Sequence, residues 1–193
     1  SFLIERGQGI KVFSQILQMT RNHNMLVMTL KKSGNIENQA YEGATVLGAK
    51  SGAYMDTPIT GLDFASLYPT IMRAHNLCHS TLVMDSKYDN MEHIEYESID
   101  GYKFVQNVDG ILPKMLKTLA ENRKQAKKDM AAAAKQNDYF MKSVYNGKQL
   151  AFKVSMNSIY GFTGAMVGML PCKPVASCTT SIGRKMIEQT KDL

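Results

Sequence analysis

The chain has 193 residues, a formal net charge of +6 and 44% hydrophobic residues, enough to bury the core of one domain or of two small ones. No apolar run approaches the roughly 18 residues that a membrane span requires, and no signal peptide is visible, so we expect no membrane partner and an intracellular, non-secreted protein. The three cysteines lack the paired spacing of a zinc site, which favours reduced thiols.

The charge is distributed unevenly along the chain. Residues 1–102 contain 8 Lys/Arg and 11 Asp/Glu, whereas residues 103–193 contain 15 and 6. A basic half indicates a polyanionic partner such as nucleic acid, although a solvated helix surface explains many such imbalances. The sequence starts at Ser1 and stops at Leu193 within an unfinished pattern, so we expect an internal fragment of a longer protein.

The first forty residues predict a helix and a loop. Apolar residues within 11–17 recur at helical spacing. Residues 25–28 fit either a strand or a buried helix, and residues 33–38 are polar with a glycine, as in a loop.

Tyr41 and Gly43 precede a run of β-forming residues. The glycine would let a sugar-phosphate backbone approach closely, with the Tyr41 ring packed beside it. The alternative is an ordinary glycine turn that enters a strand.

Asp63 follows residues 57–62, which look like a short apolar strand, and precedes a short helix around residues 69–74. A carboxylate at the end of a strand suits a hard cation such as Mg²⁺, and the unpaired N–H groups of a following helix suit an anion. The pattern fits a metal-bound phosphate. Taken alone, Asp63 is more often a helix N-cap than a metal ligand.

The second half of the chain begins with an acidic, solvated connection at residues 85–100 and continues with a long helix from Leu112. Pro113 suits the first turn of that helix. At about 100° per residue, Arg123 and Lys127 fall within the apolar stripe of Leu112, Leu116, Leu119 and Met130. Two inward cations would suggest an enclosed anion, because burying unpaired charge is costly. The alternative is that this end of the helix leaves the core.

Residues 137–147 look like the tip of a helical hairpin, and residues 148–162 form the next predicted helix. One side of this helix is apolar, and the other carries Lys153, Asn157, Tyr160 and Gly161. Residues 164–174 read as turns and a short strand, and residues 179–193 as an amphipathic helix that begins with Thr/Ser caps.

Three of these segments resemble motifs of family B DNA polymerases, in the order of that family. They are Tyr41-Glu42-Gly43-Ala44, Asp63-x-x-Ser66-Leu67-Tyr68-Pro69 and Lys153-x-x-x-Asn157-Ser158-x-Tyr160-Gly161. Residues 6–12 and 161–165 are also similar to the delta-type branch and to large DNA viruses such as the algal phycodnaviruses. The similarity runs through nearly the whole chain.

The resemblance implies an α+β fold that comprises part of a polymerase palm and a helical-hairpin fingers subdomain. Residues 1–103 would be the N-terminal palm segment, residues 104–162 the fingers, and residues 163–193 a palm segment that leads toward a second catalytic motif.

The resemblance also implies template-directed nucleotidyl transfer from a deoxynucleoside triphosphate (dNTP) to a primer 3′-OH, at a site of viral or nuclear DNA replication. Two Mg²⁺ ions would assist, one held by the Asp63 carboxylate and the Phe64 carbonyl. The residues expected to bind the nucleotide are Ser66, Leu67, Tyr68, Arg123, Lys127, Lys153 and Asn157. Lys153 would also act as a general acid, and Tyr68 would exclude a 2′-hydroxyl.

Tyr160 and Gly161 would line the nascent base pair, and Tyr41 and Gly43 would contact DNA. The partners implied are a DNA primer-template, dNTP and a sliding clamp bound through other regions. The family's second carboxylate motif, Tyr-Gly-Asp-Thr-Asp, is missing from these 193 residues, so we expect the fragment alone to be inactive.

Two other functions remain open. A basic helical hairpin that grips nucleic acid without chemistry would explain the charge but gives Asp63 and Tyr68 no role. A phosphohydrolase or nuclease would need several carboxylates near Asp63, and residues 57–75 supply only that one.

Overall fold

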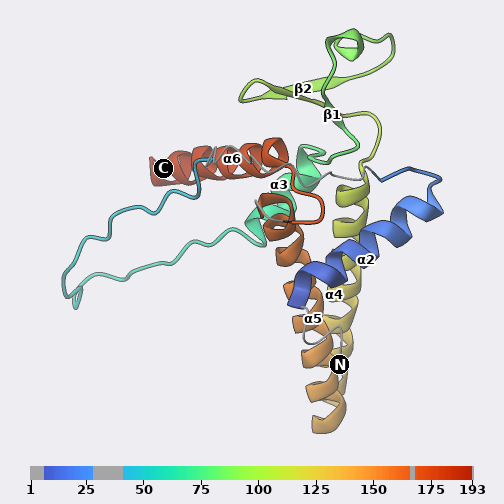
Figure 1. Cartoon of the computed structure of the whole chain (residues 1–193). Coiled ribbons are helices and arrows are strands. Elements are labelled where there is room, and N and C mark those ends of the chain that lie inside the picture. Colours follow the sequence, from blue (N-terminus) through green and yellow to red (C-terminus); the bar gives the residue numbers. More distant parts are fainter. Residues whose placement is uncertain (1–6, 28–40, 166–167, 193) are drawn as a thin grey trace.

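The computed structural model describes residues 7–27, 41–165 and 168–192 (Figure 1). Its helices and strands are, in chain order, α2 (Gly7–Asn22), α3 (Leu67–Ala74), β1 (Leu82–Val83), the 3-10 helix η1 (Ser86–Tyr88), β2 (Tyr96–Ile99), β3 (Tyr102–Val105), α4 (Ile111–Lys135), α5 (Tyr139–Gly164) and α6 (Lys173–Lys191). The predicted α+β class is confirmed. None of the helices in these ranges has the length and apolarity that would carry it through a bilayer.

Helices α4 and α5 form a long hairpin that projects away from the rest of the molecule (Figure 1). Its turn is shorter than the predicted tip at residues 137–147, because Tyr139 is already helical. The Asp138 carboxylate accepts a hydrogen bond from the Met141 N–H at 2.9 Å and so caps the first turn of α5. The cap explains why α5 starts nine residues before the expected Lys148.

The two helices of the hairpin pack along a stripe with seven-residue spacing. Leu112, Leu119, Ala126 and Ala133 of α4 are all buried. This spacing is typical of helices that wind around one another. Near the tip the buried residues shrink to alanine, so apolar burial, and with it the stabilisation of the hairpin, is concentrated at its base.

The base of the hairpin is surrounded by shorter helices. Helix α2 crosses it, with Val12 and Ile16 buried and the ring of Phe13 6.3 Å from that of Phe162 (Figure 1). The predicted helix around residues 11–17 is therefore confirmed. Helix α3 contacts α4, α5 and α6, which places the residues after Asp63 at the centre of the base.

Helix α6 begins six residues before the predicted start at Thr179, because Pro174 occupies a favourable first-turn position. Thr179 and Thr180 are not caps. Both are buried within the helix, and their hydroxyls donate to carbonyls one turn back, at Val175 and Ala176. Residues 168–172 lead into α6 without the predicted short strand.

A small antiparallel sheet lies at the end of the molecule opposite the hairpin tip (Figure 1). Its strand order is β1-β3-β2, with Leu82 opposite Phe104 and Tyr96 opposite Val105. Phe104 is fully buried and joins the sheet to the main core. Most of the acidic connection at residues 85–100 is solvent-accessible, as predicted, but it also contains η1 and β2.

Residues 57–62 do not form the predicted strand. They belong to an extended arm, residues 44–63, that runs outward and back beside α6 (Figure 1). Ile59 and Leu62 are 71% and 80% exposed, respectively. A strand needs a neighbour to receive its backbone hydrogen bonds, and no described strand lies beside the arm.

The expectation of a strand or buried helix at residues 25–28 is also wrong for residues 25–27. These residues are irregular, and Leu26 is fully exposed because no described element covers it. Met28 and the loop predicted at residues 33–38 lie outside the described ranges.

Asn76 joins α3 to the start of α4. Its side-chain amide donates to the carbonyls of Val105 (2.7 Å) and Val108 (2.8 Å), and its side-chain oxygen accepts from the Gly110 N–H (2.8 Å). The residue is 5% exposed and has a positive φ of 48°. One side chain therefore satisfies three backbone groups at the junction of sheet, hairpin and α3.

We expect Asn76→Ala to lower the free energy of unfolding by about 3 kcal/mol, because it leaves buried backbone groups unpaired and places alanine in the left-handed region. Urea unfolding measures this loss. Asn107→Ala is the control, because its one hydrogen bond, to the His93 carbonyl, is exposed. A loss as small as that of the control, under about 1 kcal/mol, would contradict the role assigned to Asn76.

Candidate functional site

The turn that carries Asp63 ends in a left-handed residue. Ser66 has φ 53° and ψ 52°, occupies the N-cap position of α3, and makes no side-chain capping bond. Asp63 is exposed and lies three residues before the cap, so it is not the helix N-cap that sequence considerations alone would favour. The first N–H groups of α3, at Leu67 and Tyr68, are thus not capped by the Ser66 side chain and can face an anion.

Three tyrosines from distant parts of the chain meet beside this turn. The ring of Tyr68, in α3, lies 4.5 Å from that of Tyr160, in α5, with an angle of 39° between the planes. The Tyr160 hydroxyl lies 3.4 Å from that of Tyr41. We call Tyr41, Tyr68 and Tyr160 the tyrosine cluster. It brings together one residue from each of the three sequence motifs.

Two glycines make room for the tyrosine cluster. A side chain at Gly164 would overlap the Tyr41 hydroxyl, and a Cβ at Gly183 would lie 3.2 Å from the Tyr68 ring. Gly183 is inside α6, where glycine costs roughly 1 kcal/mol relative to alanine, and Gly164 is the last residue of α5. The close approach of the rings explains that cost.

The environment of Tyr160 keeps its hydroxyl protonated. Burial, with the hydrogen bond to Tyr41 and the nearby Tyr68, raises the pKa of Tyr160 well above its usual value. Tyr160 is therefore uncharged at neutral pH and offers a flat, neutral ring to a ligand.

Helix α5 presents the predicted polar face beside the tyrosine cluster. Lys153, Asn157 and Gly161 are exposed, whereas Met156 and Ile159 on the other side are buried. No atom lies within 4 Å of a Cβ built on Gly161, so packing does not explain its glycine. Gly161 also lines a shallow groove whose other members are Gln8, Gly9, Ile10, Ser158, Phe162, Ala165, Gly168 and Met169.

The structure separates the two cations expected on the inner stripe of α4. Arg123 is half-buried, and its Nε donates to Gln149 of α5 at 3.4 Å. Lys127 is exposed, so its predicted inward position is wrong. The inner stripe passes through Ala126 instead, because paired helices follow a seven-residue repeat rather than the straight-helix angle.

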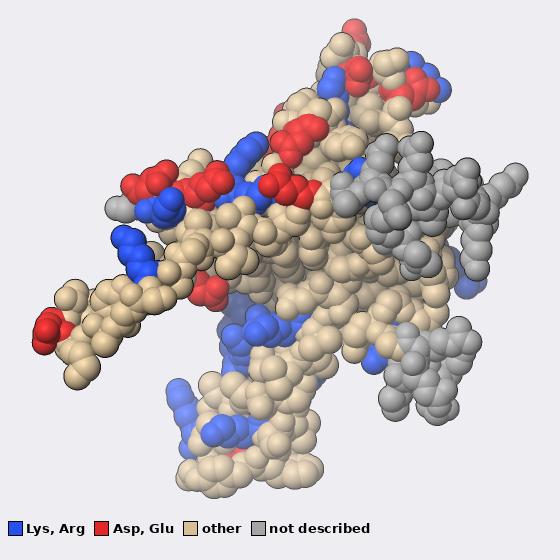
Figure 2. Space-filling model, turned by 60° about the vertical axis from the view of Figure 1, so that its left-hand side comes forward, with Lys and Arg blue, Asp and Glu red and all other residues tan. Residues whose placement is uncertain are grey.

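The hairpin has a strong excess of basic over acidic residues. Residues 111–164 contain ten Lys/Arg and three Asp/Glu. Figure 2 shows a group of basic side chains over the lower, hairpin end, while the upper end carries most of the acidic side chains together with other basic ones. Such a surface attracts a polyanion to the side of the molecule where Lys153 lies.

Only some of the predicted site residues contact one another in the structure. The three tyrosines of the cluster contact one another. In the described ranges, however, no hydrogen bond or ion pair links Asp63 to Arg123, Lys127 or Lys153. Nor does any group of three His, Cys, Asp or Glu side chains in those ranges converge as metal ligands would. Asp63 and the Phe64 carbonyl are hard oxygen donors that fit Mg²⁺, and they form an incomplete set.

Sequence considerations missed Arg184 and Thr180 of α6, which bond to the backbone of Glu42 and Gly43. No local pattern marks them, because their partners lie far away in the sequence.

Comparisons with known proteins cover the whole chain. The family model of DNA polymerase family B matches residues 1–193. The DNA polymerase delta catalytic subunit of Arabidopsis thaliana is 50% identical over 199 residues, which cover 100% of this chain and 18% of that protein. A DNA polymerase of Paramecium bursaria Chlorella virus NY2A is 46% identical, over 96% of this chain and 21% of that protein.

The solved structure of a family B DNA polymerase from the archaeon Pyrobaculum calidifontis matches with a TM-score of 0.71 and 25% identity. The match covers 97% of this chain and 24% of that one. The chain thus spans about a fifth of the length of the curated relatives it matches.

The raised pKa of Tyr160 predicts a stability that falls at alkaline pH. The folded state holds this proton more tightly than the unfolded state, so the contribution is complete below about pH 10 and is lost as pH rises further. Absorbance titration of tyrosinate should show one phenol that ionises last and that disappears in Tyr160→Phe. The exposed Tyr139→Phe is the control and should keep that last step. Its disappearance in both variants, or in neither, would contradict the assignment.

Proposed function

Since the chain belongs to DNA polymerase family B, we propose that the protein containing it performs template-directed transfer of nucleotides from dNTPs to a primer 3′-OH during DNA replication. The observation that supports this most directly is the contact between Tyr68 and Tyr160. It brings Tyr68 of the Asp63 motif against Tyr160 of the Lys153 motif, and this supports a shared role for the two motifs.

Asp63 and the carbonyl of Phe64 are the proposed ligands of Mg²⁺. When bound, the two ions of a complete enzyme would neutralise the charge on the reacting phosphate oxygens. Asp63 supplies one carboxylate, and the second carboxylate motif is absent from these residues. We therefore expect residues 1–193 alone to have no polymerase activity.

The triphosphate would lie between α3 and the hairpin. The N–H groups of Ser66 and Leu67 lie at the N-terminus of α3, where the helix dipole favours an anion. Lys153, exposed on α5, would bind the phosphate oxygens as a point charge and protonate the leaving pyrophosphate. Arg123 and Lys127 would complete the clamp, Lys127 from the exposed side of α4.

The nascent base pair would lie on the polar face of α5. Tyr160 offers a neutral ring, Gly161 a bare stretch of backbone, and Asn157 an amide. Stacking on such a surface stabilises any base without reading its identity. Tyr41 and Gly43 would contact the DNA from the adjoining segment.

The three segments would have separate tasks within the enzyme. Residues 104–162 contain the basic hairpin and would act as the fingers. Residues 1–103 and 163–193 would belong to the palm, which holds the metal and the primer end. The rival binding module leaves the Tyr68–Tyr160 contact and the exposed Asp63 without a role.

The test of this function is primer extension by the parent enzyme with single lysines removed. We expect Lys153→Ala to lower kcat/KM for dNTP about a hundredfold or more, because it removes both phosphate binding and a proton donor. Lys124→Ala and Lys128→Ala remove charges of the hairpin that are also exposed and should cost less than about threefold. Equal, small losses in all three variants would defeat the assignment.

Tyr68 should control the choice of sugar. Its ring is held between Tyr160 and Gly183, so it cannot swing away from a 2′-hydroxyl. We expect Tyr68→Ala to raise incorporation of ribonucleotides relative to deoxyribonucleotides by at least about tenfold. Competition assays with the parent enzyme measure that ratio, with the exposed Tyr88→Ala as control. An unchanged ratio would remove Tyr68 from this role.

A further inference from the structure

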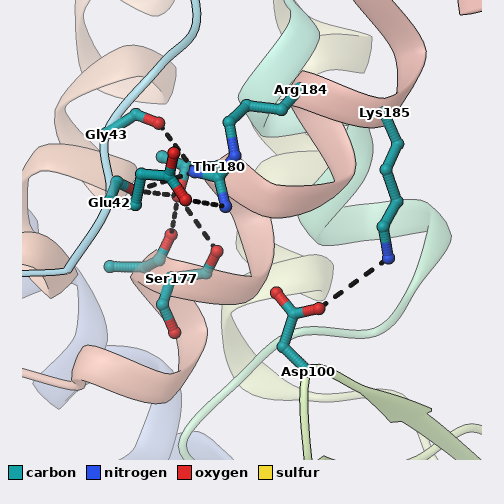
Figure 3. Close-up of polar contacts among 8 residues, drawn as sticks. Glu42, Gly43, Asp100, Ser177, Thr180, Arg184 and Lys185 are labelled. Atoms are coloured by element: carbon teal, nitrogen blue, oxygen red, sulfur yellow. Dashed lines mark hydrogen bonds and ion pairs between the residues drawn. The ribbon is translucent and has the colours of Figure 1, made fainter. Parts of the chain in front are cut away.

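Arg184 of α6 binds the backbone of a segment that lies more than a hundred residues away in the sequence (Figure 3). Its Nη1 donates to the carbonyls of Glu42 at 2.9 Å and Gly43 at 2.7 Å, and its Nη2 lies 3.2 Å from the Glu42 carboxylate. Thr180, one turn earlier on α6, donates to the same Glu42 carbonyl at 2.9 Å. We call this set of contacts the Arg184 clamp.

The guanidinium is committed to the protein itself. The Arg184 side chain is only 17% exposed, and both of its terminal nitrogens already bond to Glu42 or Gly43. A cation that binds DNA phosphates needs free donors directed at solvent. Arg184 is therefore suited to hold the chain in place rather than to bind DNA.

The Arg184 clamp adjoins the tyrosine cluster. Tyr41 immediately precedes Glu42, and its hydroxyl lies 3.4 Å from that of Tyr160 and directly over Gly164. Residues 41–43 thus form a bridge from α6 to α5. Beyond the bridge, residues 46–63 are all exposed, so the arm gives the bridge little support.

We propose that Arg184 is a positioning residue that sets the place of Tyr41 and, through it, of the Tyr160 ring. It would thereby influence how strictly a correct base pair is selected, without touching the substrate. Within the described residues, the hydrogen bond between Tyr41 and Tyr160 links the segment held by the clamp to the proposed base-pair surface. This inference rests on the polymerase function proposed above.

The experiment compares Arg184→Ala, Arg184→Lys and Lys185→Ala in the complete parent enzyme. Lys185 is a matched control on the same helix, because it forms an exposed ion pair with Asp100 at 3.7 Å that does not reach the tyrosine cluster (Figure 3). We expect Arg184→Ala to lower kcat/KM for the correct dNTP about tenfold more than for a mismatched one, since small misplacements cost the well-aligned reaction most. Arg184→Lys keeps a charged hydrogen-bond donor but loses the planar, multidentate guanidinium. This variant should recover part of the discrimination between correct and mismatched dNTPs.

A double-mutant cycle tests the route through Tyr41. If Arg184 acts by placing Tyr41, the loss of discrimination in Tyr41→Phe combined with Arg184→Ala should not exceed that of the more severe single variant. The salt dependence of DNA binding should keep its slope in Arg184→Ala, whereas a lost phosphate contact would reduce it by about one. Additive effects, unchanged discrimination or a reduced slope would each overturn the proposal.

Hydrogen exchange separates this inference from the polymerase function itself. Exchange of a peptide covering residues 41–50 should rise in Arg184→Ala and, more weakly, in Thr180→Val, but not in Lys185→Ala. Unchanged exchange would overturn the clamp even if all the enzymes are active. A wild-type parent enzyme that incorporates no nucleotide would instead refute the proposed function, and with it the effect on base-pair selection.

Discussion

The contact between Tyr68 and Tyr160 is the constraint on which the rest of this structure depends. The two rings lie 4.5 Å apart although they belong to α3 and α5, which also meet α6 at this point. Because aromatic rings pack at such a distance only when both backbones are held closely, the contact requires a helix turn at Ser66, a long hairpin with a rigid base, and glycine at position 183. Together these features bring Tyr68, five residues after Asp63, against Tyr160 of α5.

The apolar core of the hairpin is concentrated at its base. Leucines fill its inner stripe near the base, and alanines replace them toward the tip, so the apolar core stops well before Asp138. Lys153, Asn157 and Tyr160 lie on the part of α5 that this core supports. The tip carries charge on a thin pair of helices, which suits the attraction of a polyanion more than precise geometry.

Local sequence patterns predicted the helices of this fold well and its strands poorly. The apolar repeat found α2, α4 and α5 because a helix satisfies its own backbone, whereas residues 57–62 needed a neighbouring strand that no described residue provides. The starts of α5 and α6 were predicted too late in the sequence, because a single residue, Asp138 as a cap and Pro174 in the first turn, determines each of them. The motifs located Tyr41, Tyr68 and Tyr160, but Lys127 was misplaced by a straight-helix angle. Arg184 could not be predicted, because its partners lie 141 and 142 residues away.

Helix α6 supplies none of the proposed catalytic groups, yet it supports two walls of the site. Gly183 faces the Tyr68 ring, and the next residue, Arg184, holds Glu42 and Gly43 beside Tyr41. A shift of α6 along its axis would therefore move the walls at Tyr68 and Tyr41 together, because interior packing transmits small displacements. If Tyr68 faces the sugar and Tyr41 and Tyr160 the base pair, as proposed, both surfaces are coupled through α6. Their specificities should then change together when α6 is altered and separately when Tyr68 or Tyr41 is replaced.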